Sequence, residues 1–301
     1  MFLTASLTGE NAVIFPEILA LLIGLVCADR LPWKTDTIHT LLLMTLCAIA
    51  GCVIVRYVPF IMYFKALIGL SFAAVLITIT DCMLMPCLSA VLLPIYLNDG
   101  SVLYPCAVFV MVGAVLLIRS LLIHSGMKEA AIKFHYTPNF EYDLKIWLKI
   151  LIAFALMALT PMLLRDLPLE APIDAVRGIP ELIFIIAPPL VVTMSEAFFR
   201  DMRGRRFRVW FIMTIAAVTG ALMRFIGVEL LDITPAVPAV IAAMITVLEM
   251  KLMNIYFPPA GAAVLLAFLV EGNVFLYPPM IAAGCLLVLI AASIFGVKRN
   301  Y

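Results

Sequence analysis

Charged side chains are scarce in this sequence. Only 13% of its 301 residues are Asp, Glu, Lys or Arg, whereas 65% are hydrophobic. Soluble globular domains have about 25% charged residues. The composition therefore excludes an ordinary soluble domain and indicates an integral membrane protein, whose surroundings are the lipid bilayer. The formal net charge of +1 shows no bias toward polyanions, and we expect no nucleic-acid partner.

Side chains that carry out chemistry are also scarce. The three histidines, His39, His124 and His135, lie far apart in the chain, and the seven cysteines show no metal-ligand spacing. The sequence has neither a nucleophile with a neighbouring base nor a phosphate-binding loop. We therefore expect no enzymatic activity, no metal, no cofactor and no disulfide bonds.

Long uncharged stretches recur along the chain, and each is near or a little under the roughly 20 residues that a helix needs to cross the hydrocarbon layer. They cover residues 14–28, 38–55, 59–80, 102–123, 146–164, 182–199, 209–228, 235–250 and 275–296. They lack the alternating polar positions of a membrane barrel. We predict an all-α, polytopic membrane protein of about 11 transmembrane or half-membrane helices, forming a single domain over residues 1–301. No basic segment precedes the first stretch, so we expect it to remain as a helix.

Two further apolar runs, 86–97 and 259–270, are shorter. At 1.5 Å per residue, each spans about 18 Å of a hydrocarbon layer that is about 30 Å thick. Each forms a short crossing, a tilted crossing or a re-entrant helix. If both cross and the amino terminus is outside, most of the 20 Lys and Arg residues fall in inner loops, as the positive-inside rule requires. This favours eleven segments with a cytoplasmic carboxyl terminus, and the re-entrant arrangement remains open. We expect the membrane to be a bacterial cytoplasmic membrane.

Internal similarity indicates a duplication. The stretch "PCLSAVLLPIYLNDGSVLYP" at 86 resembles "PAGAAVLLAFLVEGNVFLYP" at 259, and "TLCAIAGCVIVR" at 45 resembles "TIAAVTGALMR" at 214. The spacing between matching segments drifts by only a few residues. We predict two parallel repeats of about five helices, 15–123 and 179–297, joined by a linker, 124–178, that holds one extra helix.

Proline begins both short runs. Proline at the first turn starts a helix without wasting a donor, and small residues after it leave the amides uncovered. Free amides at the positive end of a helix bind anions, although the same small residues also suit close helix packing. The predicted substrate-binding residues are Pro86, Cys87, Ser89, Pro258, Pro259, Ala260 and Gly261.

Ionisable residues inside apolar segments cost about 3 kcal/mol or more at the bilayer centre, so their repetition in both halves is informative. Asp81 and Glu249 precede the short runs and are candidates for coupling proton movement to transport, with a solvated or Lys251-paired carboxylate as the alternative. Six further ionisable residues are candidates. Arg56 and Arg224 attract an anion or extend to lipid headgroups, Glu17 and Glu181 cap helix starts, and Lys65 and Glu196 are single candidates.

The stretch "FPPAGAAVLLAFL" at 257–269, with "GCLLVLIAA" in the last apolar segment, resembles the HPP family of integral membrane proteins, which is named for a His-Pro-Pro motif followed by Ala-Gly-Ala. The resemblance covers about residues 145–297, and the first repeat resembles a more diverged copy. Pro258, Pro259, Ala260 and Gly261 match the motif, but the family's histidine is Phe257 here, so no protonation role transfers to that position. The resemblance implies transport of a small anion such as nitrite.

The expected function is secondary transport of a small, anionic solute through a central site formed by the two broken helices. An anion channel would use the same amides without coupled charges. General helix character also resembles that of aromatic acid exporters of the fusaric acid resistance type. A further alternative is a non-transporting subunit whose basic segment "RDMRGRRFR" at 200–208 docks a cytoplasmic partner. A homo-oligomer is compatible with the sequence, which does not fix the solute, the direction of transport or the coupling ion.

Overall fold

The computed structural model describes residues 1, 14–28, 31–128, 139–166, 184–200, 202, 204–270 and 272–295. Within these ranges all regular elements are helices and no residue is in a strand, which confirms the all-α prediction. The main helices are α2 (Glu17–Leu22), α3 (Thr37–Tyr57), α4 (Met62–Thr80), α5 (Pro86–Leu97), α6 (Leu103–His124), α7 (Phe140–Asp166), α9 (Pro188–Phe199), α10 (Arg206–Arg224), α11 (Ala236–Leu252), α12 (Pro258–Leu266) and α13 (Tyr277–Phe295).

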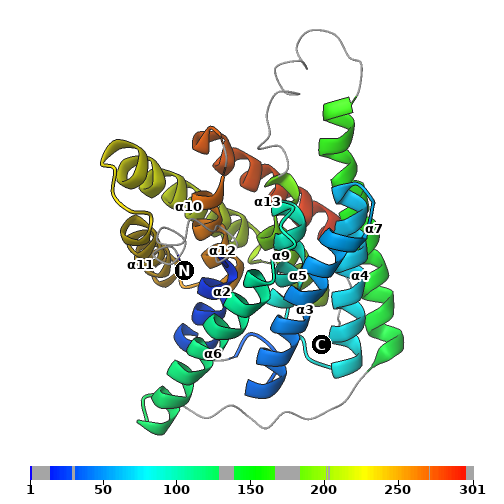
Figure 1. Ribbon diagram of the computed structural model, residues 1–301, viewed down its shortest axis with the longest axis horizontal. Coiled ribbons are helices and arrows are strands. Elements are labelled where there is room, and N and C mark those ends of the chain that lie inside the picture. The colour runs from blue at the N-terminus through cyan, green and yellow to red at the C-terminus, as the bar shows by residue number, and fades with distance from the viewer. Residues whose placement is uncertain are drawn as a thin grey trace.

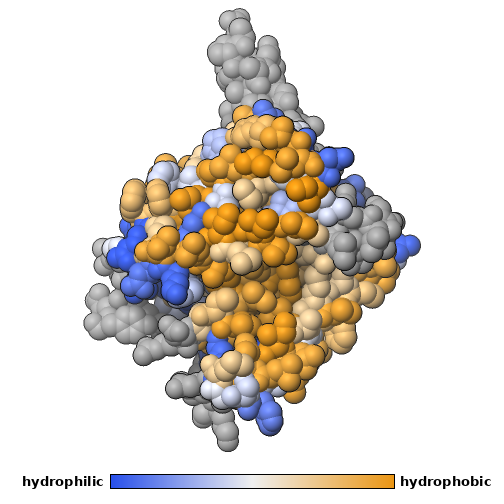
Figure 2. All heavy atoms as spheres, turned by 90° about the vertical axis from the view of Figure 1, so that its left-hand side faces the viewer, coloured by the Kyte–Doolittle hydropathy of each residue, from blue (hydrophilic) through white to orange (hydrophobic). Residues whose placement is uncertain are grey.

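Among the described residues, six helical segments are long and apolar enough to cross a membrane. They lie in α3, α4, α6, α7, α10 with its π-helical extension η4 (Phe225–Leu230), and α13 with the preceding 3-10 turn η6 (Val274–Leu276). Large apolar side chains face outward, as on α11, where Val240, Met244 and Leu252 are exposed. Figure 2 shows the broad hydrophobic surface on this side of the molecule. These features fit a multi-pass membrane protein.

Four short apolar segments occupy the interior of the bundle. They are α2 with the π-helical turn η2 (Ile23–Cys27), α5, α9, and α12 with the 3-10 turn η5 (Ala267–Leu269). All residues of α12, the first ten of α5 and the first eleven of α9 are buried. Both α2 and α9 pack against both α5 and α12, so the four meet at the centre of Figure 1. We call them the central helix cluster.

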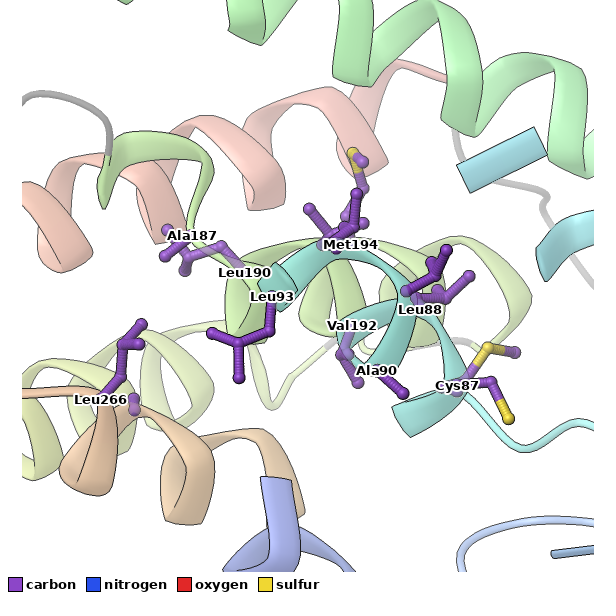
Figure 3. Packing of buried hydrophobic residues seen from close by; sticks show 14 of the residues in the cluster. Cys87, Leu88, Ala90, Leu93, Ala187, Leu190, Val192, Met194 and Leu266 are labelled. Atoms are coloured by element: carbon purple, nitrogen blue, oxygen red, sulfur yellow. The ribbon is translucent and has the colours of Figure 1, made fainter. Parts of the chain in front are cut away.

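Interlocking apolar side chains hold the central helix cluster together. In Figure 3, Ala90 and Leu93 of α5 lie beside Leu190 and Val192 of α9, and all four are essentially inaccessible to solvent. The long helices surround this cluster, so its short helices face protein rather than lipid. The chain therefore places its irregular backbone where a membrane protein can tolerate it.

The sequence predicted two short helices, and the described part of the chain contains four. The stretch 182–199, expected to be a nearly full-length span, contains a 3-10 turn at 184–186 and an extended residue, Ala187, before α9 starts at Pro188. The stretch 14–28 holds the six-residue α2 and the π turn η2. The expectation for 182–199 was wrong because that apolar run conceals a backbone break, although the Pro188–Pro189 pair is a helix-start signal. In 14–28, α2 continues into η2 without a break, so the expected first helix is present but covers only Glu17–Cys27.

Two glycines allow long helices to touch the central helix cluster. A Cβ atom on Gly51 of α3 would lie 2.4 Å from the carbonyl oxygen of Val91 in α5, and one on Gly220 of α10 would lie 2.3 Å from that of Val264 in α12. Backbone atoms cannot rotate away as side chains do. Close approach of α3 to α5, and of α10 to α12, therefore requires glycine at both positions.

We predict that Gly51→Ala lowers the free energy of unfolding by about 1–3 kcal/mol, because the methyl group overpacks against the Val91 carbonyl. Gly113→Ala in α6 is the matched control, since a Cβ there meets nothing within 4 Å. That change should be neutral or stabilising by up to about 1 kcal/mol. Thermal unfolding of the purified variants in one detergent measures both, and equal melting temperatures would refute the close-approach argument.

Candidate functional site

The proline-led helix starts are buried, but several of their amides already have acceptors. The N–H to O bonds are Cys87 to Leu84 (3.1 Å), Leu88 to Met85 (3.0 Å) and Ala260 to Phe257 (3.1 Å). The prediction that these amides are free is therefore wrong at Cys87, Leu88 and Ala260. The residues before each start form a tight turn, because a buried N–H without a partner costs free energy.

Gly261 permits close helix packing. A Cβ atom there would lie 2.5 Å from Ile23 Cδ1 and 3.3 Å from the backbone nitrogen of Ala20. The start of α12 thus lies directly against α2, as the packing interpretation of the small residues expects. Substrate binding by the seven residues predicted at the two helix starts stays a prediction, and all seven are buried.

A cavity of about 350 Å³ lies next to the start of α5. We call it the ion-pair pocket. Its lining residues come from the segment before α3, the α4–α5 loop, the start of α7 and the end of α9; they are Lys34, Asp81, Met83, Met85, Asn139, Tyr142, Asp143, Phe199 and Arg200. Its volume is in the range of small-molecule sites, and polar groups converge on it. The predicted coupling residue Asp81 and the residue that precedes Pro86 therefore share one cavity.

An ion pair fixes one wall of the ion-pair pocket. Lys34 donates to Asp81, whose side chain is 5% exposed. The Met83 N–H also donates to the Lys34 carbonyl at 3.1 Å. Asp81 ends α4 in the left-handed conformation, with φ of 54°. The chain between α4 and α5 is thus attached to the start of α3 by a side-chain bond and a backbone bond.

The N-cap of α3, Asp36, follows two residues after Lys34. Asp36 Oδ1 accepts from the His39 N–H, and Oδ2 lies 2.8 Å from His39 Nδ1. Partial burial alone would raise the pKa of Asp36, but the hydrogen bonds from His39 and its charge hold that pKa below its ordinary value. The cap therefore stays ionised at neutral pH.

The other wall of the ion-pair pocket carries a second charge cluster. Glu196 of α9 is buried, and its Oε1 accepts from Trp33 Nε1 at 3.1 Å. Its Oε2 lies 4.0 Å from an Arg200 nitrogen. Lys34 and Arg200 are thus balanced by acidic groups. Sequence reasoning found Glu196 but treated Lys34 as a charge that sets orientation and Arg200 as part of the basic segment 200–208. It missed the link from Trp33 to Glu196, because partners far apart in sequence cannot be recognised from one chain.

The remaining predicted charges lie apart from this pocket. Glu249 Oε1 accepts from Thr219 Oγ1 at 2.7 Å, not from Lys251. Arg224 donates to the carbonyl oxygens of Ala267, at 2.9 Å, and Val270, and therefore ties down the chain after α12. The other two cations lie at the ends of long helices: Arg56 is exposed beside the Tyr57 ring, and Lys65 donates to the Val55 carbonyl.

Glu17 does not cap α2, contrary to the sequence prediction. No side-chain cap hydrogen bond is present at this helix start. Glu17 is instead 1% exposed inside the central helix cluster, and neither of its carboxyl oxygens has a hydrogen-bond partner. Its predicted repeat equivalent, Glu181, lies outside the described residues.

Comparison of the chain with protein-family models, curated proteins and solved structures found no match. The resemblance of residues 257–269 to the HPP family therefore stays a prediction.

We predict that the Lys34–Asp81 pair is energetically coupled. A double-mutant cycle of Lys34→Gln and Asp81→Asn should give a coupling of about 1–3 kcal/mol, because the Asp81 carboxylate is buried. The Glu141–Lys145 pair of α7 is the control, since its side chains are 83% and 69% exposed, and it should give at most about 0.5 kcal/mol. Unfolding in detergent measures both cycles, and equal couplings would contradict the buried ion pair.

Proposed function

We propose that the protein is a secondary transporter of a small, anionic solute. One observation carries the proposal. Four helices too short to cross the hydrocarbon lie together inside a bundle of long ones, and two of them hold a buried carboxyl group, Glu17 in α2 and Glu196 in α9. Interrupted helices with ionisable groups in the membrane interior form the substrate sites of many secondary transporters.

Two parallel repeats, 15–123 and 179–297, provide the moving parts in this proposal. Contacts at corresponding positions support them. The Tyr104 hydroxyl donates to the Ala90 carbonyl at 3.1 Å, and the Tyr277 hydroxyl donates to the Ala263 carbonyl at 2.6 Å, 14 residues upstream in both cases. In addition, α2 packs on α12 while α9 packs on α5. Each half thus contributes a short helix that covers the broken helix of the other half.

Rocking of one repeat against the other would open the central helix cluster alternately to the two sides of the membrane. The ion-pair pocket is the vestibule on one side, since it borders α5 and the end of α9. The linker, 124–178, contributes α7, whose first turns line the same pocket. The amino terminus outside and the carboxyl terminus in the cytoplasm complete the proposed arrangement.

The anionic character of the solute rests on Lys34 and Arg200 and on the family resemblance. Because acidic side chains already balance these cations, an anion gains binding free energy mainly by replacing a carboxylate as partner. Asp81 is the group to replace, because it pairs with Lys34 at the pocket wall. A nitrite-like anion is small enough for a cavity of about 350 Å³.

We predict that proteoliposomes containing the protein take up at least one of nitrite, nitrate and formate faster than protein-free liposomes. Gly261→Val should abolish this uptake, because its branched side chain forces α12 away from Ile23 and the Ala20 backbone. Gly261→Ala is the control and should keep most of the uptake, since its methyl group mainly displaces the flexible end of Ile23. No uptake of any anion by the wild-type protein, or full uptake by the valine variant, would count against the proposal.

A proton-coupled carrier needs the carboxyl groups of Asp81 and Glu249, whereas an anion channel does not. We predict that Asp81→Asn or Glu249→Gln removes pH-driven accumulation of the transported anion, because an amide cannot bind and release a proton. Exchange of internal for external anion should persist when the pH is the same on both sides of the membrane. An anion channel would keep its full electrical conductance in both variants. Accumulation in a pH gradient, compared with conductance in planar bilayers, separates the two functions. Stoichiometric co-purification of a soluble protein would instead favour the docking alternative.

A further inference from the structure

One buried carboxyl group has no evident counter-charge. Glu17 lies in the central helix cluster, and both of its carboxyl oxygens lack a hydrogen-bond partner. The Ser89 hydroxyl of α5 lies beside this carboxyl, is fully buried and is likewise without a partner. Two complementary polar groups from two short helices thus face each other in an apolar interior.

The groups identified around Glu17 among the described residues are two phenols, the Ser89 hydroxyl and apolar side chains. The nearby phenols are Tyr104 of α6 and Tyr277 of α13, and both donate their protons to backbone carbonyls. From α12 the facing surface is apolar. Lys128 lies at the far end of this segment, beyond α2, where it donates to the carbonyls of Val26 and Ala28.

The protonation state follows from the energetics of burial. A carboxylate without a cation in an apolar interior costs several kcal/mol, and this cost is avoided when the group binds a proton. A neutral carboxyl group also has an O–H that Ser89 Oγ can accept, which an ionised carboxylate lacks. The surroundings therefore favour the acid form.

We infer that Glu17 is a proton-binding site, which holds a proton while the central helix cluster is closed. Where transport is concerned, the inference rests on the proposed function: the proton is the coupling ion. Glu17 releases it when α2 separates from α12 and water reaches the carboxyl group. The π-helical turn η2 follows α2 directly, and such turns are frequent at functional sites.

Infrared spectroscopy of the purified protein at neutral pH tests proton occupancy without any substrate. The wild-type protein should show the C=O stretching band of a protonated carboxylic acid, and Glu17→Gln should lose it. Ser89→Ala should shift the band, because the neighbouring hydroxyl is lost, and Glu249→Gln should leave it unchanged. A band that persists in Glu17→Gln, or its absence from the wild-type protein, would overturn the inference.

Stability provides a second measurement. Gln has the shape of neutral Glu, so Glu17→Gln should melt near the wild-type temperature at about pH 5 and above it at about pH 9, where the wild-type carboxyl group must ionise. A variant that is less stable at both pH values would indicate that Glu17 is charged in the fold. Absence of the infrared band from a wild-type protein that transports anions refutes only the proton site. A normal band in a wild-type protein that moves no anion refutes only the transport function.

Discussion

The fold depends on the need to satisfy every backbone polar group that is removed from water. Short helices expose more unpaired N–H and C=O groups per residue than long ones, and lipid offers no partners for them. The protein therefore keeps α2, α5, α9 and α12 inside a bundle of longer helices. There, the first amides of α5 and α12 donate to preceding carbonyls, and Arg224 donates to the carbonyls that follow α12.

The same constraint governs the ionisable side chains. Asp81 pairs with Lys34, Glu196 accepts from Trp33, and Glu249 accepts from Thr219, so each of these carboxyl groups recovers part of its lost hydration. Neither oxygen of Glu17 has such a bond, although Glu17 is the least exposed of the group; Glu249 leaves only Oε2 without one. A residue that violates the rule its neighbours obey is a candidate for function rather than for stability.

The two predicted repeats differ in the partners of their charged residues. Tyr104 and Tyr277 make the same kind of bond to α5 and α12. By contrast, Asp81 and Glu249, which the predicted repeats align, bind a lysine and a threonine respectively. The described pocket with charged walls therefore lies beside α5, and polar solutes would meet a different surface at each half. Such asymmetry is compatible with a transporter whose two sides are opened in turn.

The sequence by itself determined the all-helical membrane class, because long uncharged segments have no other stable form in lipid. It also located α5 and α12, since proline followed by small residues marks a helix start. Only the tertiary structure decided that the 182–199 stretch is broken at Ala187, that the amides of Cys87 and Ala260 are occupied, and that Glu17 is buried rather than capping. Those features arise from contacts between residues far apart in the chain, such as Gly261 with α2 and Trp33 with Glu196, and local patterns in one sequence do not encode which distant segments meet.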